Sequence, residues 1–106
     1  MRAEILKGHL DLLLLAAVRA RPAHGYAVID ELRRRSGGTF DLPEGTVYPA
    51  LHRLERSGLL ASHWSDESGR RRRIYSVTDR GKAALSQQHQ DWTTFSRAVG
   101  AVVADA

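Results

Sequence analysis

The sequence predicts a mainly α (α+β) fold, with one two-stranded hairpin in a chain of 106 residues. Three observations predict this class. Apolar residues recur at helical spacing in three segments between residues 10 and 57. Two short stretches of alternating apolar and polar residues follow, on either side of a polar turn that contains glycine. A last segment, from about residue 79 to the C-terminus, again has apolar residues at helical spacing.

The first two predicted helices provide much of the expected core. Residues 10–18 are nearly all leucine and alanine, which are strong helix formers, so we expect a helix buried on most sides. Pro22 ends that helix, because proline lacks the backbone N–H that a helix requires. A second helix is expected over residues 25–36, where the apolar residues share one face and the pair Gly37-Gly38 follows.

A third helix is expected over residues 44–57. Its apolar residues between Val47 and Leu54 fall on one stripe at about 100° per residue. The residues of its outer face and flanks are Thr46, Tyr48, Pro49, His52, Arg53 and Arg56. Because proline is harmless only in the first helical turn, the regular helix either starts near Thr46 or bends at Pro49.

The hairpin is expected from residues 60–64 and 71–77, with residues 66–69 as its turn. Four arginines in succession, Arg70 to Arg73, follow the turn. Such like charges repel one another unless an anionic partner is present. Thr78 is a suitable N-cap for the last helix.

The last helix carries large apolar side chains at intervals of seven, three, four and three residues. They are Leu85, Trp92, Phe95, Val99 and Val102. This seam is too apolar to remain in water, so we expect two copies of the chain to pair through it.

The order of helices, hairpin and long helix is that of a winged helix-turn-helix with a C-terminal dimerisation helix. Several short motifs agree with this order. They are Leu6-Lys7-Gly8, His24-Gly25-Tyr26, the run from Gly45 to Leu51, Arg53-Leu54-Glu55, Gly58-Leu59-Leu60, Gly69-Arg70-Arg71-Arg72, and Tyr75, Thr78 and Gly81. On these motifs, residues 5 to about 92 resemble the small, single-domain members of the PadR family of bacterial transcriptional regulators. The chain departs from the family at Pro43-Glu44, where many relatives have a serine cap.

The resemblance implies a homodimer that binds a double-stranded DNA operator, usually as a repressor. We expect residues 1–78 to form the DNA-binding domain, with residues 79–106 as a dimerisation helix in the same compact unit. The residues expected to contact DNA are His24, Tyr26, Thr46, Tyr48, Pro49, His52, Arg53, Arg56, Arg70, Arg71 and Arg72. Arginines neutralise phosphates, and tyrosine or threonine hydroxyls bond to phosphates and base edges.

Two of these assignments, and the role of the neighbouring Arg73, have alternatives. Arg53 can meet O6 and N7 of a guanine, but it could instead contact phosphate or pair with an acidic neighbour. Arg73 could pair with an acidic residue and hold the wing to the body. At the start of the second helix, an anion site competes with a structural role, in which Gly25 permits a close helix contact and Tyr26 belongs to the core.

Two reading helices in a twofold dimer imply an inverted repeat, with half-sites roughly 10 bp apart from centre to centre. Trp92 and Phe95 could also line an apolar pocket for a small aromatic effector across the twofold axis. The alternatives to a DNA-binding regulator are an aromatic-ligand sensor with weak DNA affinity and a winged-helix protein-interaction module.

The composition narrows the remaining possibilities. There is no cysteine, which excludes disulfides, thiolate zinc sites and iron–sulfur clusters. The five histidines lack metal-ligand spacing, and no catalytic or nucleotide-binding motif is present. We therefore expect no enzyme activity, no metal and no cofactor. With no membrane segment or leader pattern, a cytoplasmic location is expected.

Overall fold

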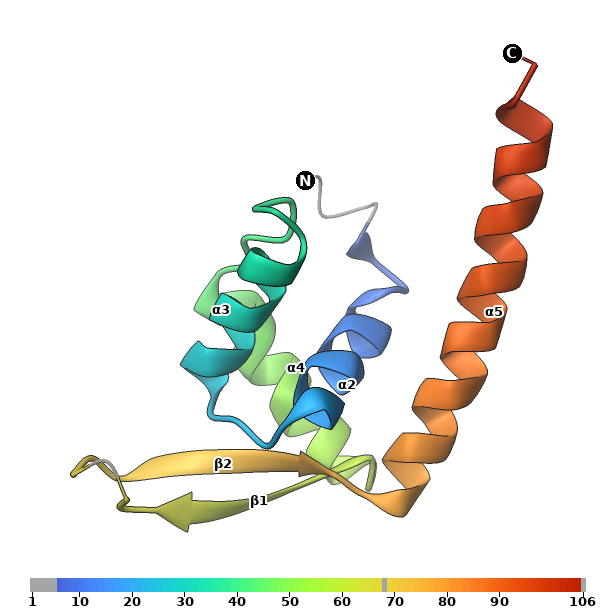
Figure 1. Ribbon diagram of the computed structural model, residues 1–106. Helices are drawn as coiled ribbons and strands as arrows, with labels where there is room; N and C mark the ends of the chain where they lie inside the picture. The colour runs from blue at the N-terminus through green and yellow to red at the C-terminus, as the bar shows by residue number, and fades with distance from the viewer. Residues whose placement is uncertain (1–5, 68, 106) are drawn as a thin grey trace.

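The computed structural model describes residues 6–67 and 69–105 and confirms the predicted class. The elements are α2 (Leu10–Ala20), α3 (Gly25–Arg35), α4 (Glu44–Arg56), β1 (Leu60–Ser65), β2 (Arg72–Val77) and α5 (Asp79–Val103). Helices α2, α3 and α4 cluster over the hairpin, while α5 rises beside them and extends beyond them (Figure 1). The hairpin is the wing of a winged helix-turn-helix.

The core lies between the three clustered helices and the base of the wing. Its buried side chains come mainly from the apolar stripes that the sequence predicts. They are Leu14, Leu15, Ala17, Val18, Val28, Leu32, Leu42, Val47, Ala50, Leu51, Leu54, Leu60 and Tyr75. Tyr75 of β2 is only 1% exposed, so the wing contributes its own large side chain to the core. Burial of this apolar surface fixes the wing beneath α2 and α4.

The wing is paired on both edges of β2. On one edge, β1 and β2 are antiparallel, in a register that runs from Leu60 opposite Val77 to Ser65 opposite Arg72. On the other edge, the backbones of Ala23 and Tyr75 exchange two hydrogen bonds, of 3.0 and 2.9 Å. Ala23, two residues before α3, is therefore attached to the middle of the wing.

The start of α4 agrees with the predicted range of residues 44–57, and the alternative start near Thr46 is wrong. The helix begins at Glu44 and continues through Pro49. No side chain caps it; instead, the carbonyl of Pro43 accepts the N–H groups of Thr46 and Val47, at 3.0 and 3.1 Å. The carbonyl at the N-cap thus accepts the N–H of Thr46, which a capping side chain could otherwise accept.

The start of α5 confirms its predicted cap. The hydroxyl of Thr78 accepts the N–H of Gly81 at 3.0 Å and donates to the carbonyl of Gly58 at 2.6 Å. A Cβ on Gly81 would collide with the carbonyl oxygen of Leu59 and approach Val77 to 2.7 Å. Glycine therefore lets α5 begin in close contact with the segment that leads into β1.

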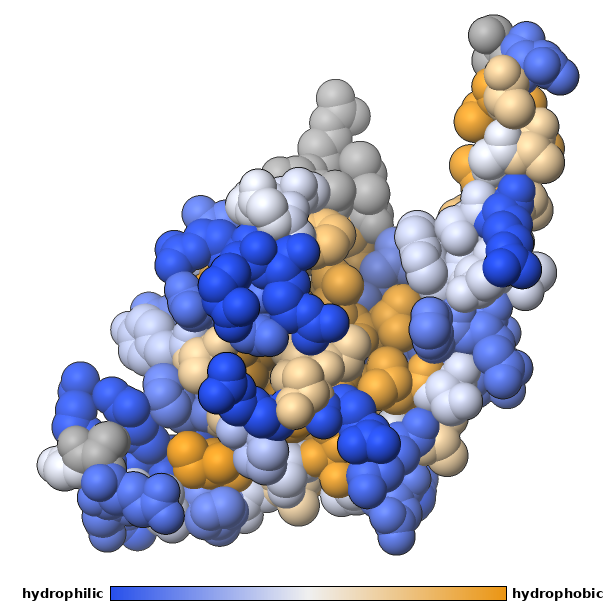
Figure 2. Space-filling view, viewed as in Figure 1, coloured by the Kyte–Doolittle hydropathy of each residue, from blue (hydrophilic) through white to orange (hydrophobic). Residues whose placement is uncertain are grey.

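The apolar seam of α5 packs against the body at its start and is exposed to solvent further along. Leu85, the first residue of the predicted dimer seam, is partly buried against the core of its own chain. Further along, the ring of Trp92 meets His9 edge-on, with 5.2 Å between centroids. Phe95 and Val102 are 57% and 81% exposed. Figure 2 shows apolar surface between the body and α5, and again near the end of α5.

Candidate nucleic-acid interface

Six of the predicted DNA-contact residues surround one hollow where α3, α4 and the wing meet. The hollow has a volume of about 450 Å³ and is lined by His24, Tyr26, Tyr48, Arg70, Arg71 and Arg72. We call it the basic hollow. Figure 2 shows hydrophilic surface over the wing end of the molecule. Three arginines and two phenol groups together can bind an anion of the size of a nucleic-acid phosphate.

The arginines of the basic hollow are available to such an anion. Among the described residues, no carboxylate lies within ion-pair distance of Arg70, Arg71 or Arg72. The arginine run of α3 is different, because Arg33 to Arg35 pair with Asp30 and Glu31 of the same helix. Position in the fold therefore separates two arginine runs that look alike in the sequence.

The outer residues of α4 point in three directions. Pro49, His52 and Arg56 are exposed, as the sequence predicts. Thr46 and Arg53 lie on the flank towards α2, whereas Tyr48 lies on the flank towards α3. Of the six predicted contact residues on α4, only Thr46 and Tyr48 are partly buried.

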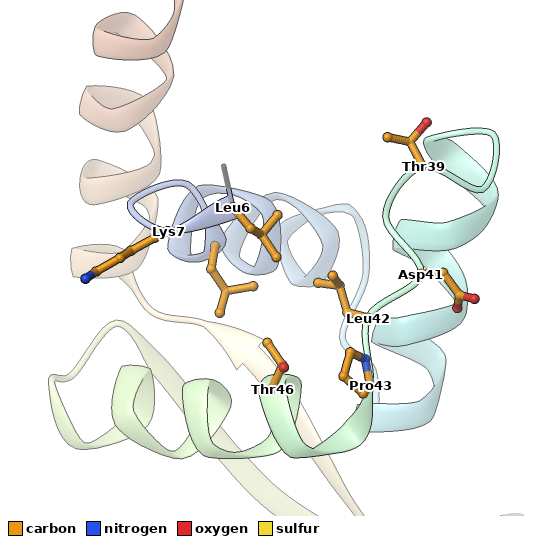
Figure 3. Close-up of a pocket in the computed structure, with 8 residues that line it drawn as sticks. Leu6, Lys7, Thr39, Asp41, Leu42, Pro43 and Thr46 are labelled. Atoms are coloured by element: carbon orange, nitrogen blue, oxygen red, sulfur yellow. The ribbon is translucent and has the colours of Figure 1, made fainter. Parts of the chain in front are cut away.

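Thr46 is a correction to the sequence prediction. It is partly buried and lines a cavity of about 290 Å³ with Leu6, Leu10 and Leu42. Figure 3 shows its side chain pointing from α4 towards Leu6 and Leu42. Thr46 therefore does not lie on the outward face of α4, and its contact with DNA remains a prediction.

Arg53 is paired with Asp11 of α2, which was the third of its predicted alternatives. The two guanidinium nitrogens donate to the two carboxylate oxygens at 2.6 and 3.1 Å. These hydrogen bonds to Asp11 raise the pKa of Arg53, while its partial burial lowers it to a smaller extent. Both side chains are partly exposed, so the pair links two helices at the surface.

Tyr48 packs against the start of α3, which confirms the close contact predicted at Gly25. A Cβ on Gly25 would lie 2.5 Å from the Tyr48 ring. Tyr26 is 61% exposed and meets Tyr48 edge-on, with 6.3 Å between centroids, so its assignment to the core is wrong. A hydrogen bond to the carboxylate of Glu44 raises the pKa of Tyr26, and burial and then the same carboxylate raise the pKa of Tyr48. Both phenols thus stay protonated, and Tyr26, whose single O–H is directed at Glu44, would donate to a phosphate only after leaving that carboxylate.

His24 connects the cap of α3 with the wing. Its Nδ1 faces the N–H of Ala27 at 3.4 Å, and its Nε2 lies 3.1 Å from a guanidinium nitrogen of Arg72. A neutral imidazole has one acceptor nitrogen, so it can accept from only one of these donors at a time. Burial, and then the charge of Arg72, lower the pKa of His24.

Two residues that contact the arginine run, Glu55 and Trp64, were not among the predicted site residues. Glu55 accepts from Arg73 at 3.5 Å and from Ser62 at 2.6 Å, so Arg73 holds the wing to α4 as one alternative predicted. Trp64 lies under two guanidinium groups, with the Arg71 and Arg73 carbons 4.6 and 5.3 Å from its ring centroid. Cross-strand register in the hairpin was the signal that could have identified Trp64, because it places Trp64 opposite Arg73.

The predicted effector residues, Trp92 and Phe95, border a separate apolar cavity of about 360 Å³. Its lining consists of Leu6, His9, Leu12, Leu13, Phe40, Trp92 and Phe95. The described residues contain no cluster of three metal-ligating side chains. They also contain no helix that is both long and apolar enough to cross a bilayer.

Comparison with known proteins shows the family. Residues 14–87 match the profile of the transcriptional regulator PadR-like family. The transcriptional regulator Rv3488 of Mycobacterium tuberculosis is 34% identical over 96 residues, which cover 91% of this chain and 87% of that protein.

Solved structures agree with this assignment. A PadR family transcriptional regulator from Eggerthella lenta superposes with a TM-score of 0.83 at 32% identity, covering 97% of this chain and 88% of the other. A PadR family regulator from Clostridium difficile gives a TM-score of 0.79 at 32% identity, covering 91% and 99%. The chain is therefore a transcriptional regulator of the PadR family.

Proposed function

We propose that this regulator binds an inverted-repeat DNA operator as a homodimer and acts as a repressor. The observation that supports this most is the basic hollow, where three wing arginines that pair with no carboxylate of the described residues lie next to the start of α3 and the flank of α4. In this proposal, the exposed face of α4 enters a major groove and the basic hollow binds the adjacent phosphates. Such a function requires a cytoplasmic location, with access to DNA.

The homodimer is supported by the far half of α5. Phe95, Val99 and Val102 are exposed on one side of a helix that extends beyond the body. An apolar surface of this kind is typical of an interface between subunits. In a twofold dimer, each α5 would cover the apolar surface of the other chain and set the distance between the two copies of α4.

The test is a comparison of two triple variants that remove equal charge. The first variant removes the arginines of the basic hollow by Arg70→Ala, Arg71→Ala and Arg72→Ala. The second removes three arginines that are paired within α3, by alanine at Arg33, Arg34 and Arg35. The first variant should flatten the plot of log affinity against log salt by roughly 0.9 per lost phosphate contact. Fluorescence anisotropy with a labelled duplex measures this slope, and equal slopes in the two variants would contradict the proposal.

The duplex itself can be selected from the DNA upstream of the regulator's own gene. A twofold dimer should prefer an inverted repeat over a single half-site or a scrambled sequence. A repressor should lower transcription from a promoter that contains this repeat, in an assay with purified RNA polymerase. Increased transcription would show an activator instead, while leaving DNA binding intact.

A second function is favoured by the apolar cavity beside Trp92. Its lining is hydrophobic except for His9, which suits a flat aromatic molecule. Quenching of Trp92 fluorescence by aromatic compounds would indicate a ligand sensor. A winged-helix protein-interaction module would instead bind an acidic protein that duplex DNA at low salt does not displace.

A further inference from the structure

Trp64 is an exposed aromatic residue in the middle of the charged wing. Trp64 is 52% exposed, and it is one of the two tryptophans in the chain. In the register of the hairpin it lies directly opposite Arg73. The two guanidinium groups over its ring are those of Arg71 and Arg73, at 4.6 and 5.3 Å from the centroid. A guanidinium at this distance is attracted by the negative face of the indole.

The two arginines of this stack are held differently at their outer ends. Arg73 also donates to Glu55, which in turn accepts from Ser62, so this part of the wing is anchored on α4. Arg71 lines the basic hollow, and no carboxylate of the described residues lies within ion-pair distance of it. Trp64 is therefore the contact that connects Arg71 to the anchored part of the wing.

Arg71 differs from its neighbour Arg70 in this respect. Both side chains line the basic hollow, but among the described contacts only Arg71 and Arg73 have guanidinium groups over the Trp64 ring. An arginine side chain loses much rotamer freedom when it is fixed on a ligand. A side chain that is already held in place loses less of this freedom on binding, which strengthens the complex.

From this geometry we infer that Trp64 is a positioning residue for DNA binding, which holds Arg71 ready for a phosphate of the duplex. The inference rests on the proposed DNA-binding function. It assigns the phosphate contact to Arg71 and the orientation of Arg71 to the indole. Trp64 keeps its effect on affinity only as long as Arg71 is present.

A double-mutant cycle on duplex affinity tests this dependence. Trp64→Ala should weaken binding about two- to fivefold for each wing that contacts the duplex, as expected for one cation–π contact. The same substitution should have almost no effect in the Arg71→Ala background. In the Arg70→Ala background, which is the matched control, it should weaken binding as much as in the natural chain.

The salt dependence separates positioning from a charge contact. Trp64→Ala leaves all charges in place, so it should lower affinity at every salt concentration with little change in slope. Arg71→Ala should reduce the slope by roughly 0.9 per contact. Trp64→Phe, which keeps an aromatic face, should restore part of the affinity, while Trp64→Leu should not.

A measurement without DNA tests the stack itself. In a Trp92→Phe chain, Trp64 is the one remaining tryptophan and its emission reports on the guanidinium groups over its ring. Arg71→Ala should shift this emission, and Arg70→Ala should leave it unchanged. This arm keeps Trp64 in place, so it is independent of whether Trp64→Ala folds normally.

The outcomes distinguish this inference from the proposed function. Equal losses of duplex affinity from Trp64→Ala in the presence and absence of Arg71 would overturn the inference. An unchanged Trp64 emission in Arg71→Ala would overturn it as well. In both cases, a salt slope that still depends on Arg70 to Arg72 would leave the proposed function intact. A chain that binds no duplex at low salt would overturn both.

Discussion

At the scale of single residues, Arg53 shows how one ion pair can change the role of a side chain. Its planar fork suits a guanine edge, but in the structure the fork already holds both carboxylate oxygens of Asp11. An exposed pair of this kind contributes about 0–1 kcal/mol to stability. Its larger effect is to neutralise one arginine on the flank of α4.

Asp11→Asn should therefore release Arg53 while costing less than about 1 kcal/mol of unfolding free energy. The freed guanidinium and the lost carboxylate should strengthen binding to cognate and scrambled duplexes alike and steepen the salt slope. Anisotropy titrations and thermal unfolding measure the two effects. If Asp11→Asn instead relaxes the preference for one base pair of the operator, the pair orients Arg53 for a base and the neutralising role is wrong.

His24 gives the chain a pH dependence with a definite sign. Its pKa is lowered from 6.5 by burial and then by Arg72, so the unfolded chain takes up the proton more readily than the folded chain. The free energy of unfolding should fall as the pH drops below 6.5, until the folded chain is protonated as well. The cause is that the folded chain buries the imidazole and places it beside the charge of Arg72, and both disfavour its protonated form.

His24→Asn is the matched variant for this prediction, because asparagine also caps helices but does not titrate. The difference in midpoint temperature between neutral and mildly acidic buffer should be smaller in His24→Asn than in the natural chain. The remaining four histidines are common to both proteins. An unchanged pH dependence would assign the effect to those other histidines.

At the scale of elements, α3 and α4 are joined by a glycine and an aromatic ring. Because a Cβ on Gly25 would lie 2.5 Å from Tyr48, Gly25→Ala should push the ring outwards and destabilise the chain by about 1–3 kcal/mol. In the Tyr48→Ala background the same substitution should cost much less. Denaturant unfolding of the four proteins measures this coupling, and additive costs would show that the contact is unimportant.

The elements themselves were largely predictable from the sequence. Apolar periodicity placed all four described helices and both strands, and Thr78 marked the start of α5 because its hydroxyl suits an N-cap. The directions in which the outer side chains of α4 point were harder to predict from the sequence. A helical wheel places Thr46 and Arg53 on flanks, but only the packing of α2 determines that Leu6, Leu10 and Asp11 meet them.

The sequence predicted which residues belong to the candidate site, but not how they are arranged in space. The arginine run and the His24-Gly25-Tyr26 motif were both expected to contact DNA, and residues of both line the basic hollow. That they meet depends on the bridge between Ala23 and Tyr75, which joins segments about fifty residues apart. Short-range patterns carry no information on such a pairing, and Trp64 was missed because its partners depend on the register.

At the scale of the whole molecule, the seam of α5 should decide the oligomeric state. Val99→Glu together with Val102→Glu places charges on the exposed apolar side and should convert a dimer into monomers. Ala101→Glu, on the opposite side of the same helix, is the control and should leave the dimer intact. Sedimentation measures the mass, and a double variant that remains dimeric would exclude this face as the interface.

The close contact at Gly81 also gives α5 a mechanical property. In α5, the last residue, Val103, lies 22 residues beyond Gly81, so the far end lies roughly 33 Å from the point where Gly81 rests on Leu59. Treated as a rigid rod that turns about this contact, the helix acts as a lever and the contact as its pivot. A tilt of about 5° at the pivot moves the far end by about 3 Å, nearly the rise of one base pair along DNA. A small adjustment beside Gly81 is thereby amplified into a change in the span between distant parts of an assembly.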